Sequence, residues 1–237
     1  MTIIAATQAW NDRKDICMAT IGVIGGTGHL GRAIARRLAK AGHAVTIGSR
    51  VADKAQIVAT ELAGDGIAVA SGSNAEIAAS KDVLIVTVPY AAQAVTLTEI
   101  KPYLGDAIVV DTTVPLMPPK VMRVQLPTAG SAALAAQALL GDGIRLVTAF
   151  HNVAAHILDT DARVECDVLV FSDDAEARNV VVGLAADMGL RGLSGGALAN
   201  SVAAEALTSI LIYMNKIYGG DGAGIRFTNL TKAPPIP

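Results

Sequence analysis

The segment GGTGHLG, residues 25–31, spaces three glycines in a way that suits contact with a pyrophosphate. Gly26, Gly28 and Gly31 form a GxGxxG pattern directly after the apolar run ATIGVIG. The first glycine allows a tight turn, the second lets the backbone approach a pyrophosphate, and the third lets the next helix pack closely on the sheet. The N-terminus of that helix adds unpaired N–H groups and a partial positive charge. The segment therefore predicts a dinucleotide-binding loop.

A hydroxyl and two cations follow the next apolar run, in TIGSRVADK, residues 46–54. Ser49 and Arg50 stand about 20 residues beyond the glycine loop, where NAD-binding proteins usually place an acid for the ribose 2′-hydroxyl. Lys54 comes one helical turn after Arg50, and Thr27 offers a further hydroxyl. A carboxylate would repel a 2′-phosphate and these groups would bind it, so the pattern favours NADP over NAD. The alternative is that both cations are ordinary solvated surface residues.

Two predicted strands end in the same tripeptide, Thr-Val-Pro, at residues 87–89 and 113–115. Ligands of a parallel sheet lie beyond the carboxyl ends of its strands, and proline cannot continue a central strand. We therefore expect both tripeptides to lie under the nicotinamide end of the dinucleotide. Their side chains are apolar or hydroxylic, which suits a floor for a planar ring rather than an acid–base pair. The alternative is that both are ordinary strand terminators.

The segment AFHNVAAH, residues 149–156, places His151 beyond another predicted strand end. His151 and His156 have no carboxylate or cysteine at ligand spacing, so no metal site is expected. His151 is either a catalytic candidate or a hydrogen-bonded structural residue. The chain shows no Ser/His/Asp order and no paired carboxylates. This pattern fits hydride transfer between two redox cofactors, which needs alignment and exclusion of water more than proton chemistry.

Apolar runs alternate with amphipathic segments along most of the chain. The predicted strands are 19–25, 44–48, 67–70, 83–89, 107–115, 144–150 and 168–172. The predicted helices are 29–41, 53–62, 74–80 with Asn74 as its N-cap, 91–100, 131–140, 175–188 and 200–218. Because the strands are apolar on both faces, we expect a mostly parallel sheet covered by helices. Two βαβ units joined in this way make a doubly wound α/β fold of the Rossmann type.

Three segments are predicted along the chain. Residues 1–17 form an extension ahead of the fold, residues 18–150 form the dinucleotide-binding Rossmann domain, and residues 151–237 form a smaller α-rich domain. The predicted helix 200–218 carries few charges, so it must be buried in a second domain or against another subunit.

Composition excludes several classes of protein. The formal net charge is −2 and aromatic residues make up 3%, so neither a basic surface nor aromatic platforms for nucleic acid are expected. No uncharged apolar run is long enough for a membrane-spanning helix, and the start of the chain lacks the pattern of a secretory signal. The two cysteines are far apart and outside any CxxC, which is typical of reduced thiols in a cytoplasmic protein.

Several of these segments together resemble one family. IGVIGGTGHLG, IGSRVADK, VTVP, TTVP and FHNVAA, with the ending LANSVAAEALTSILIYMNKIYGGDGAGIRF, are similar to the NADPH-dependent coenzyme F420 reductases (F420:NADP oxidoreductases). The resemblance covers about residues 18 to 228. It implies that the protein passes a hydride between NADP and an 8-hydroxy-5-deazaflavin, coenzyme F420. It also implies a homodimer formed through residues 151–237, which would carry the deazaflavin pocket as well.

The resemblance implies a role for particular residues as well. The pyrophosphate and ribose would contact Gly26, Thr27, Gly28, His29 and Leu30. The 2′-phosphate would be held by Thr27, Ser49, Arg50 and Lys54. The nicotinamide would be flanked by Thr87, Val88, Pro89, Val114 and Ala155. The deazaflavin pocket would be lined by His151, Asn152, Val153, Ala154 and Leu207.

Two other functions stay open on the sequence alone. One is an NADPH-dependent reductase of another acceptor, such as a free flavin, a ferric chelate or an imine. For an imine, the cleft would need a proton donor, for which the histidines and Tyr90 are the candidates. The other is a sensor that binds NADP without turnover.

Overall fold

The structure is a computed structural model that describes residues 18–232. Its strands are β1 (Thr20–Ile24), β2 (Ala44–Ser49), β3 (Ala70–Ser73), β4 (Val83–Val86), β5 (Ile108–Asp111), β6 (Arg145–Thr148), β7 (Asp167–Phe171) and β8 (Arg191–Gly196). Its α-helices are α2 (His29–Lys40), α3 (Ala52–Gly64), α4 (Asn74–Ala78), α5 (Tyr90–Ile100), α6 (Ala132–Leu140), α7 (Ala155–Leu158), α8 (Ala175–Asp187) and α9 (Ser201–Tyr218). Two short 3₁₀ turns are η1 (Lys101–Tyr103) and η2 (Leu198–Asn200).

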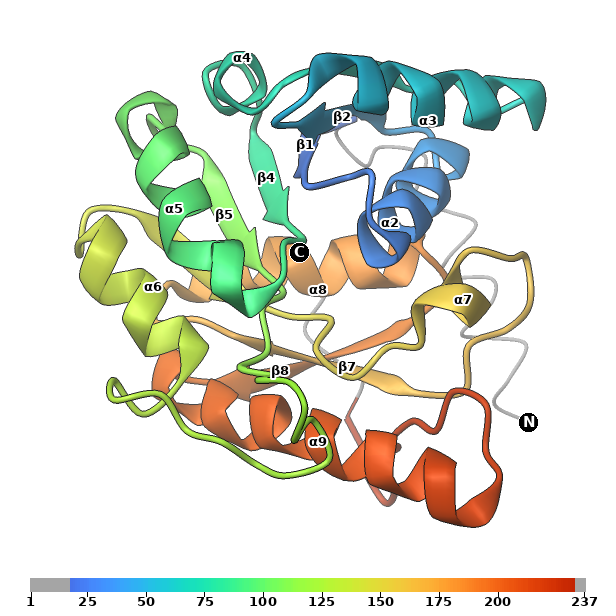
Figure 1. Ribbon diagram of the computed structural model, residues 1–237, viewed down its shortest axis with the longest axis vertical. Helices are drawn as coiled ribbons and strands as arrows, with labels where there is room; N and C mark the ends of the chain where they lie inside the picture. Colours follow the sequence, from blue (N-terminus) through green and yellow to red (C-terminus); the bar gives the residue numbers. More distant parts are fainter. Residues whose placement is uncertain (1–17, 233–237) are drawn as a thin grey trace.

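The strands form one sheet in the order β3-β2-β1-β4-β5-β6-β7-β8 (Figure 1). All pairs from β3 to β6 are parallel, whereas β6 and β7 are antiparallel. The order reverses between β1 and β4, which is the switch point where doubly wound sheets bind their ligands. The predicted α/β class, a doubly wound and mostly parallel sheet with a helical C-terminal region, is therefore confirmed.

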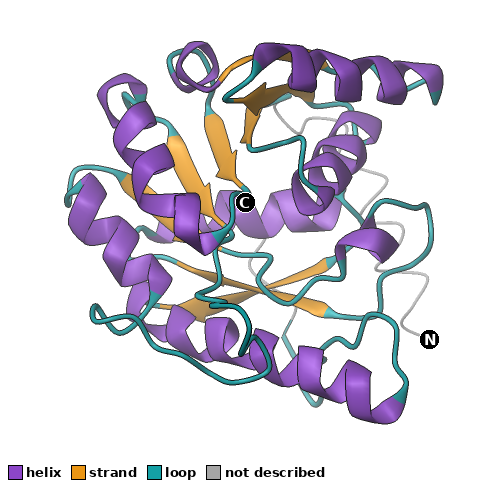
Figure 2. Ribbon diagram, viewed as in Figure 1, coloured by secondary structure: helices purple, strands orange, loops and turns teal. Residues whose placement is uncertain are grey.

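Helices cover both faces of the sheet (Figure 2). One apolar core lies between the sheet and α2, α3 and α8, and a second lies between the sheet and α4, α5 and α6. Central strands carry apolar side chains on both faces, since Val23 and Ile85 belong to the first core while Ile24 and Leu84 belong to the second. Burial on both faces is what the continuous apolar runs of these strands predict.

The structure differs from the sequence prediction at β3, α4, α7 and β8. The short helix α7 was not predicted. The third strand lies at Ala70–Ser73 rather than at 67–70. The side chain of Ser73, not that of Asn74, caps α4, and it forms a capping box with Glu76. Strand β8 was not predicted. Its sequence RGLSGG is poor in the residues typical of strands, and its pairing with β7 holds it in the sheet.

Residues after 150 contribute β7 and β8 to the same sheet and add α9 beside it (Figure 1). A boundary at residue 150 is therefore crossed by the sheet, and the division into residues 18–150 and 151–237 stays a prediction. The predicted extension 1–17 lies outside the described residues. In α9 one face is buried through residues such as Ala204 and Leu211, and the opposite face is exposed.

Candidate active site

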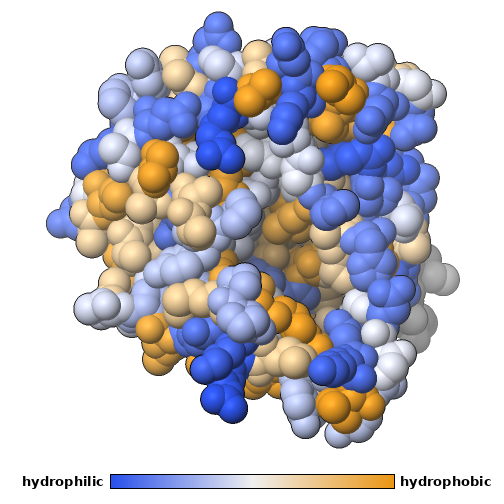
Figure 3. Space-filling model, in the orientation of Figure 1, coloured by the Kyte–Doolittle hydropathy of each residue, from blue (hydrophilic) through white to orange (hydrophobic). Residues whose placement is uncertain are grey.

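The carboxyl ends of β1, β4, β5 and β6 lie next to one another along one edge of the sheet. Hydrogen bonds continue the ladder past the strands, because Thr87 N–H donates to the Ile24 carbonyl and Thr112 N–H donates to the Val86 carbonyl. The face of the molecule drawn in Figure 3 is hollowed at its centre, and apolar side chains are visible inside the hollow. In the same orientation the tips of β4 and β5 point toward this hollow (Figure 1).

The glycine loop leaves open space and helix N–H groups at the start of α2. Gly26 N–H donates to the carbonyls of Val23 and Gly48, which fixes the turn between β1 and α2 and ties it to β2. A Cβ added at Gly28 would meet only the Gly25 carbonyl oxygen, at 3.5 Å, so the space in front of this glycine is open. Gly28 caps α2 without a side-chain acceptor, which leaves the first N–H groups of the helix free for an anion.

The other glycines of the loop allow close packing instead. A Cβ at Gly31 would lie 2.5 Å from the Thr87 hydroxyl oxygen and 2.7 Å from the Gly26 Cα. Gly25 has a φ of +75°, and a Cβ there would lie 2.8 Å from the Val88 side chain. These contacts seat the phosphate loop directly on the end of β4, so the first Thr-Val-Pro turn lies beside it.

The proposed 2′-phosphate cations have no partner in the described part of the chain. Arg50 and Lys54 are exposed, and neither makes an ion pair or a side-chain hydrogen bond within residues 18–232. Ser49 is buried, and its hydroxyl oxygen accepts from the Val51 N–H at 3.2 Å. The hydroxyl proton of Ser49 is still free to be donated to an anion.

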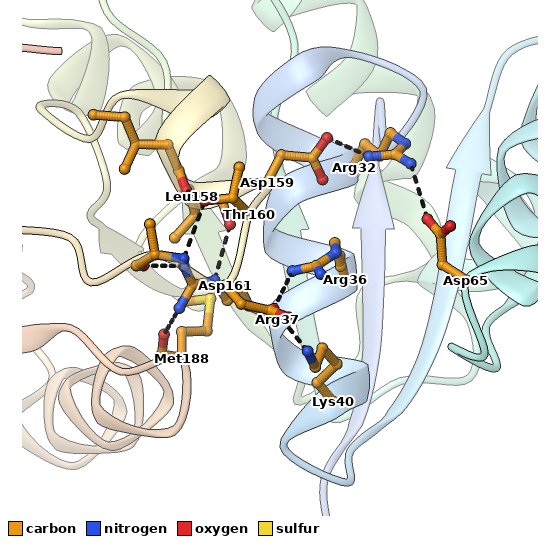
Figure 4. A network of polar contacts seen from close by, with 12 residues as sticks. Arg32, Arg36, Arg37, Lys40, Asp65, Leu158, Asp159, Thr160, Asp161 and Met188 are labelled. Carbon is orange, nitrogen blue, oxygen red and sulfur yellow. Dashed lines mark hydrogen bonds and ion pairs between the residues drawn. The ribbon is translucent and has the colours of Figure 1, made fainter. Parts of the chain in front are cut away.

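By contrast, the cationic side chains of α2 already have partners within the protein (Figure 4). Arg32 pairs with Asp159, and both Arg36 and Lys40 pair with Asp161 at 2.9 and 2.7 Å. Hydrogen bonds from Lys40 and Arg36 lower the pKa of Asp161 to about 2. This network fixes the segment after α7 to α2. The turn that precedes α7 is therefore held near α2 as well.

The turn after β6 is strained and carries His151. Phe150 has a φ of +64°, which is unusual for a bulky residue and is found where the surroundings impose the conformation. His151 is 7% exposed, and neither of its ring nitrogens has a hydrogen-bond partner among residues 18–232. Burial lowers its pKa to about 4, so the ring is neutral at pH 7. A neutral imidazole keeps one N–H to donate and one nitrogen to accept.

Asn152 ties this turn to α9. Its side-chain amide donates to the Ala204 carbonyl at 2.9 Å and to the Thr208 hydroxyl at 3.0 Å. The Thr208 hydroxyl in turn donates to the His151 carbonyl at 3.0 Å. Leu207 lies on the same turn of α9 and is half-buried. The structure therefore holds His151 and Asn152 against the turn of α9 that carries Leu207. Their assignment to a deazaflavin pocket stays a prediction.

A buried carboxylate at the end of β5 shapes the second Thr-Val-Pro turn. Asp111 is 1% exposed and accepts from the Thr113 N–H at 3.1 Å and from the Thr113 hydroxyl at 2.5 Å. Its other oxygen accepts from Gln93 at 2.5 Å. Burial raises the pKa of Asp111 against the effect of these hydrogen bonds. The turn that contains Val114 is therefore held by a side chain beneath it.

A second buried carboxylate, Glu205 of α9, lies at the N-terminus of α6. It is 2% exposed and accepts from the N–H groups of Ala132 and Ala133 at 2.7 and 3.1 Å, and from Ser201 at 3.1 Å. Burial raises the pKa of Glu205. Neither Asp111 nor Glu205 is among the site residues predicted from the sequence. The available signal was an acid at the end of an apolar strand and another in a helix with few charges.

The remaining predicted site residues lie around this edge. Thr27 and Leu30 are half-buried and His29 is exposed at the start of α2. Pro89 caps α5, Val153 packs on the first core, and Ala154 and Ala155 begin α7.

Within residues 18–232 no group of three acidic, histidine or cysteine side chains could hold a metal ion. Among the helices of those residues, none has the length and apolarity needed to cross a membrane.

The fold and this phosphate loop define a dinucleotide-binding protein of the Rossmann class. Residues 20–115 match the family model "NADP oxidoreductase coenzyme F420-dependent". The F420-dependent NADP reductase of Methanothermobacter thermautotrophicus is 40% identical over 225 residues, which are 91% of this chain and 97% of the relative. The enzyme of the same name from Methanocaldococcus jannaschii is 38% identical over 89% of this chain and 98% of its own length. The chain belongs to the family of F420-dependent NADP reductases and is an oxidoreductase.

Solved structures support the fold. A chain from Arthrobacter sp. FB24, provisionally named an F420-dependent NADP reductase, superposes with a TM-score of 0.78 at 23% identity, over 89% of this chain and all of that one. A reductive aminase from Aspergillus terreus superposes with a TM-score of 0.58 at 21% identity, over 86% of this chain and 62% of that one.

Proposed function

We propose that this protein transfers a hydride between NADPH and coenzyme F420. In balanced form, NADPH, oxidised F420 and a proton give NADP⁺ and reduced F420, and the reverse reaction uses the same site. The observation that carries the proposal is the adjacency of two turns. Ala149 N–H donates to the Asp111 carbonyl at 3.2 Å, so the turns that follow β5 and β6 leave the sheet side by side. Family membership supports the same two substrates.

On the NADP side, residues of the glycine loop and of β2 would bind the phosphates. The open space in front of Gly28 and the free N–H groups of α2 fit the pyrophosphate. Arg50 and Lys54, which have no partner among residues 18–232, fit the 2′-phosphate, to which charge-assisted hydrogen bonds contribute about 1.5–3 kcal/mol each. The assigned residues are Gly26, Thr27, Gly28, His29, Leu30, Ser49, Arg50 and Lys54 for the adenosine and phosphates, and Thr87, Val88, Pro89, Val114 and Ala155 for the nicotinamide.

On the deazaflavin side, the turn after β6 and the neighbouring turn of α9 would form the wall, through His151, Asn152, Val153, Ala154 and Leu207. The ring nitrogens of His151, which find no partner in the described part of the chain, support this assignment, since a buried imidazole normally finds partners within its own protein. When bound, the nicotinamide supplies the hydride and the deazaflavin accepts it. The protein aligns the two rings and excludes water. Because the pKa of His151 is about 4, its ring is a neutral hydrogen-bonding group at pH 7 rather than an acid.

The exposed face of α9 supports a homodimer, which also rests on the family resemblance. Ile210, Tyr213, Met214 and Ile217 are between 41% and 53% exposed and recur every three or four residues on one stripe. Apolar side chains gathered in this way mark an interaction surface more often than bare solvent contact. A cytoplasmic location stays a prediction that rests on the usage of cysteine.

The experiment that tests the function is a spectrophotometric comparison of acceptors. Purified protein is mixed with NADPH and, in parallel, with coenzyme F420, FMN, FAD or a ferric chelate. The proposal expects rapid loss of the F420 absorbance and only background rates with the others. Reduction of a flavin or the chelate in preference to F420 would instead identify another acceptor. Tight NADPH binding without any turnover would identify a sensor.

A further inference from the structure

Two fully buried carboxylates have no part in the hydride-transfer chemistry proposed above. Asp111 is 1% exposed and Glu205 is 2% exposed, and neither pairs with a lysine, arginine or histidine among residues 18–232. Buried acids without a cation are uncommon, because desolvation of the charge is offset only by hydrogen bonds. The groups that donate hydrogen bonds to Asp111 and Glu205 therefore identify the segments that these two carboxylates hold in place.

These hydrogen bonds form a continuous path between α9 and the turn after β5, which contains Thr113 and Val114 and is the turn assigned above to the nicotinamide. Asp111 accepts from Thr113 on one side and from Gln93 on the other. The same Gln93 nitrogen donates to the Ala132 carbonyl at 3.2 Å, and the Ala132 N–H donates to Glu205 at 2.7 Å. The turn after β5 is thus joined to α9 through α5 and the first residue of α6.

The neighbouring residue on α9 holds the other wall. The Ala204 carbonyl accepts from the Asn152 side chain, which lies in the turn after β6. Ala204 and Glu205 are adjacent in the helix, so their backbone positions cannot move independently. A shift or rotation of α9 would change the position of one wall relative to the other.

We infer that Asp111 and Glu205 are positioning residues that hold the turn after β5 and the turn after β6 in register through α9. This inference rests on the proposed function, because the register sets the distance between the two rings. The rate of an aligned transfer depends steeply on that distance, and a misplacement of about 1 Å costs on the order of a hundredfold. Neither carboxylate touches the reacting atoms.

The test variants are Glu205→Gln and Asp111→Asn, which keep the shape of each side chain. A glutamine at 205 cannot accept from both Ala132 and Ala133, because its amide nitrogen would face an N–H group. Ser201→Ala is a milder variant that removes one hydrogen bond to Glu205 and serves if the first two do not fold. The matched control is Ser131→Ala, which removes the side-chain cap of the same end of α6 but leaves the path intact.

The readouts are NADPH affinity by titration, thermal stability, and single-turnover reduction of F420 with NADPH or with NADPH deuterated at C4. We expect Glu205→Gln and Asp111→Asn each to slow hydride transfer about tenfold while NADPH affinity changes by less than about threefold. Ser201→Ala gives a smaller loss in the same direction. The double variant is no slower than the slower single variant, because both residues act through one path. Ser131→Ala loses stability and keeps the wild-type rate.

Three results would overturn the inference. One is a wild-type rate in Glu205→Gln or, if that variant does not fold, in Ser201→Ala. Another is a rate loss in Ser131→Ala equal to that of Glu205→Gln, which would assign the effect to a loosened helix end. A wild-type protein that does not reduce F420 at all would overturn both this inference and the proposed function, whereas normal wild-type turnover with unaffected variants overturns this inference alone.

Discussion

Gly31 in the phosphate helix lies directly against the hydroxyl of Thr87 at the end of β4, so that a Cβ on the glycine would be 2.5 Å from the Thr87 Oγ1. The Thr87 hydroxyl donates to the Ile24 carbonyl of β1 at 3.0 Å, so it cannot turn aside freely. Three elements meet at this point: the phosphate helix, β1 and the first Thr-Val-Pro turn. The site is therefore built by backbone contacts that only glycine permits.

Alanine should lower stability at one glycine of this loop and NADPH affinity at another. Gly31→Ala forces its methyl group against Thr87 and the Gly26 backbone, and overpacking of this kind costs about 1–3 kcal/mol in the free energy of unfolding. Gly28→Ala meets no close atom and keeps an extended φ of −80°, so stability should be unchanged. Its methyl group occupies the space assigned to the pyrophosphate, so NADPH binding should weaken. Urea unfolding and an NADPH titration measure the two effects, and a Gly28→Ala protein with full NADPH affinity would contradict the assignment.

Arg50→Ala should weaken the binding of NADPH much more than the binding of NADH. Loss of one or two charge-assisted hydrogen bonds to the 2′-phosphate weakens NADPH about tenfold to a hundredfold, whereas NADH lacks that phosphate. The effect should shrink as salt is added, because Arg50 is exposed. Arg163→Ala, which removes an exposed cation that pairs with Glu165, is the control. Equal weakening of NADPH and NADH in the Arg50 variant would place the 2′-phosphate elsewhere.

His151 should make stability depend on pH. Its pKa is about 4 in the folded protein and about 6.5 when unfolded, so the neutral ring stabilises the fold above pH 6.5 and this stabilisation is lost as the pH falls toward 4. Between pH 7 and pH 4 the wild type should lose about 3 kcal/mol more free energy of unfolding than His151→Leu. Denaturant unfolding at both pH values measures the difference, with His156→Leu as the control. Parallel pH profiles for wild type and His151→Leu would show that the ring is not held neutral by burial.

The exposed stripe of α9 should mediate self-association. Ile217→Asp places a charge in the stripe and should shift the protein from dimer to monomer, as measured by size-exclusion chromatography with light scattering. Val95→Asp is the matched control, because Val95 is 67% exposed on α5, outside the stripe. A monomeric wild type, or an equal effect of both variants, would be incompatible with a dimer through α9.

The central strands and the phosphate loop could be predicted because their signals are local. The run VLIVTVP and the glycine pattern at 25–31 each carry their structure within a few residues. Edge strands such as β8 could not, since RGLSGG forms a strand only because β7 pairs with it. The same holds for the buried acids. Glu205 is 73 residues from its partner Ala132, and only the packing of α9 on α6 brings the two together.

Spacing alone assigns Arg50 and Lys54 to a 2′-phosphate, because in doubly wound folds the second strand ends near the ribose. That assignment stays a prediction. What the sequence did not reveal is that Arg32, Arg36 and Lys40 of α2 pair with Asp159 or Asp161. Arg50 and Lys54 have no such partner among residues 18–232. That distinction depends on the segment after α7, more than a hundred residues further along the chain, as the separation of 127 residues between Arg32 and Asp159 shows.

In the proposed reaction the hydride passes directly from one bound ring to the other. The most direct test uses NADPH carrying deuterium at both C4 positions and oxidised F420 in ordinary water, with the reduced F420 analysed by mass spectrometry. Direct transfer places one deuterium in each molecule of reduced F420. Reduced F420 without deuterium, or no reduction at a rate above that of the enzyme-free mixture, would contradict it.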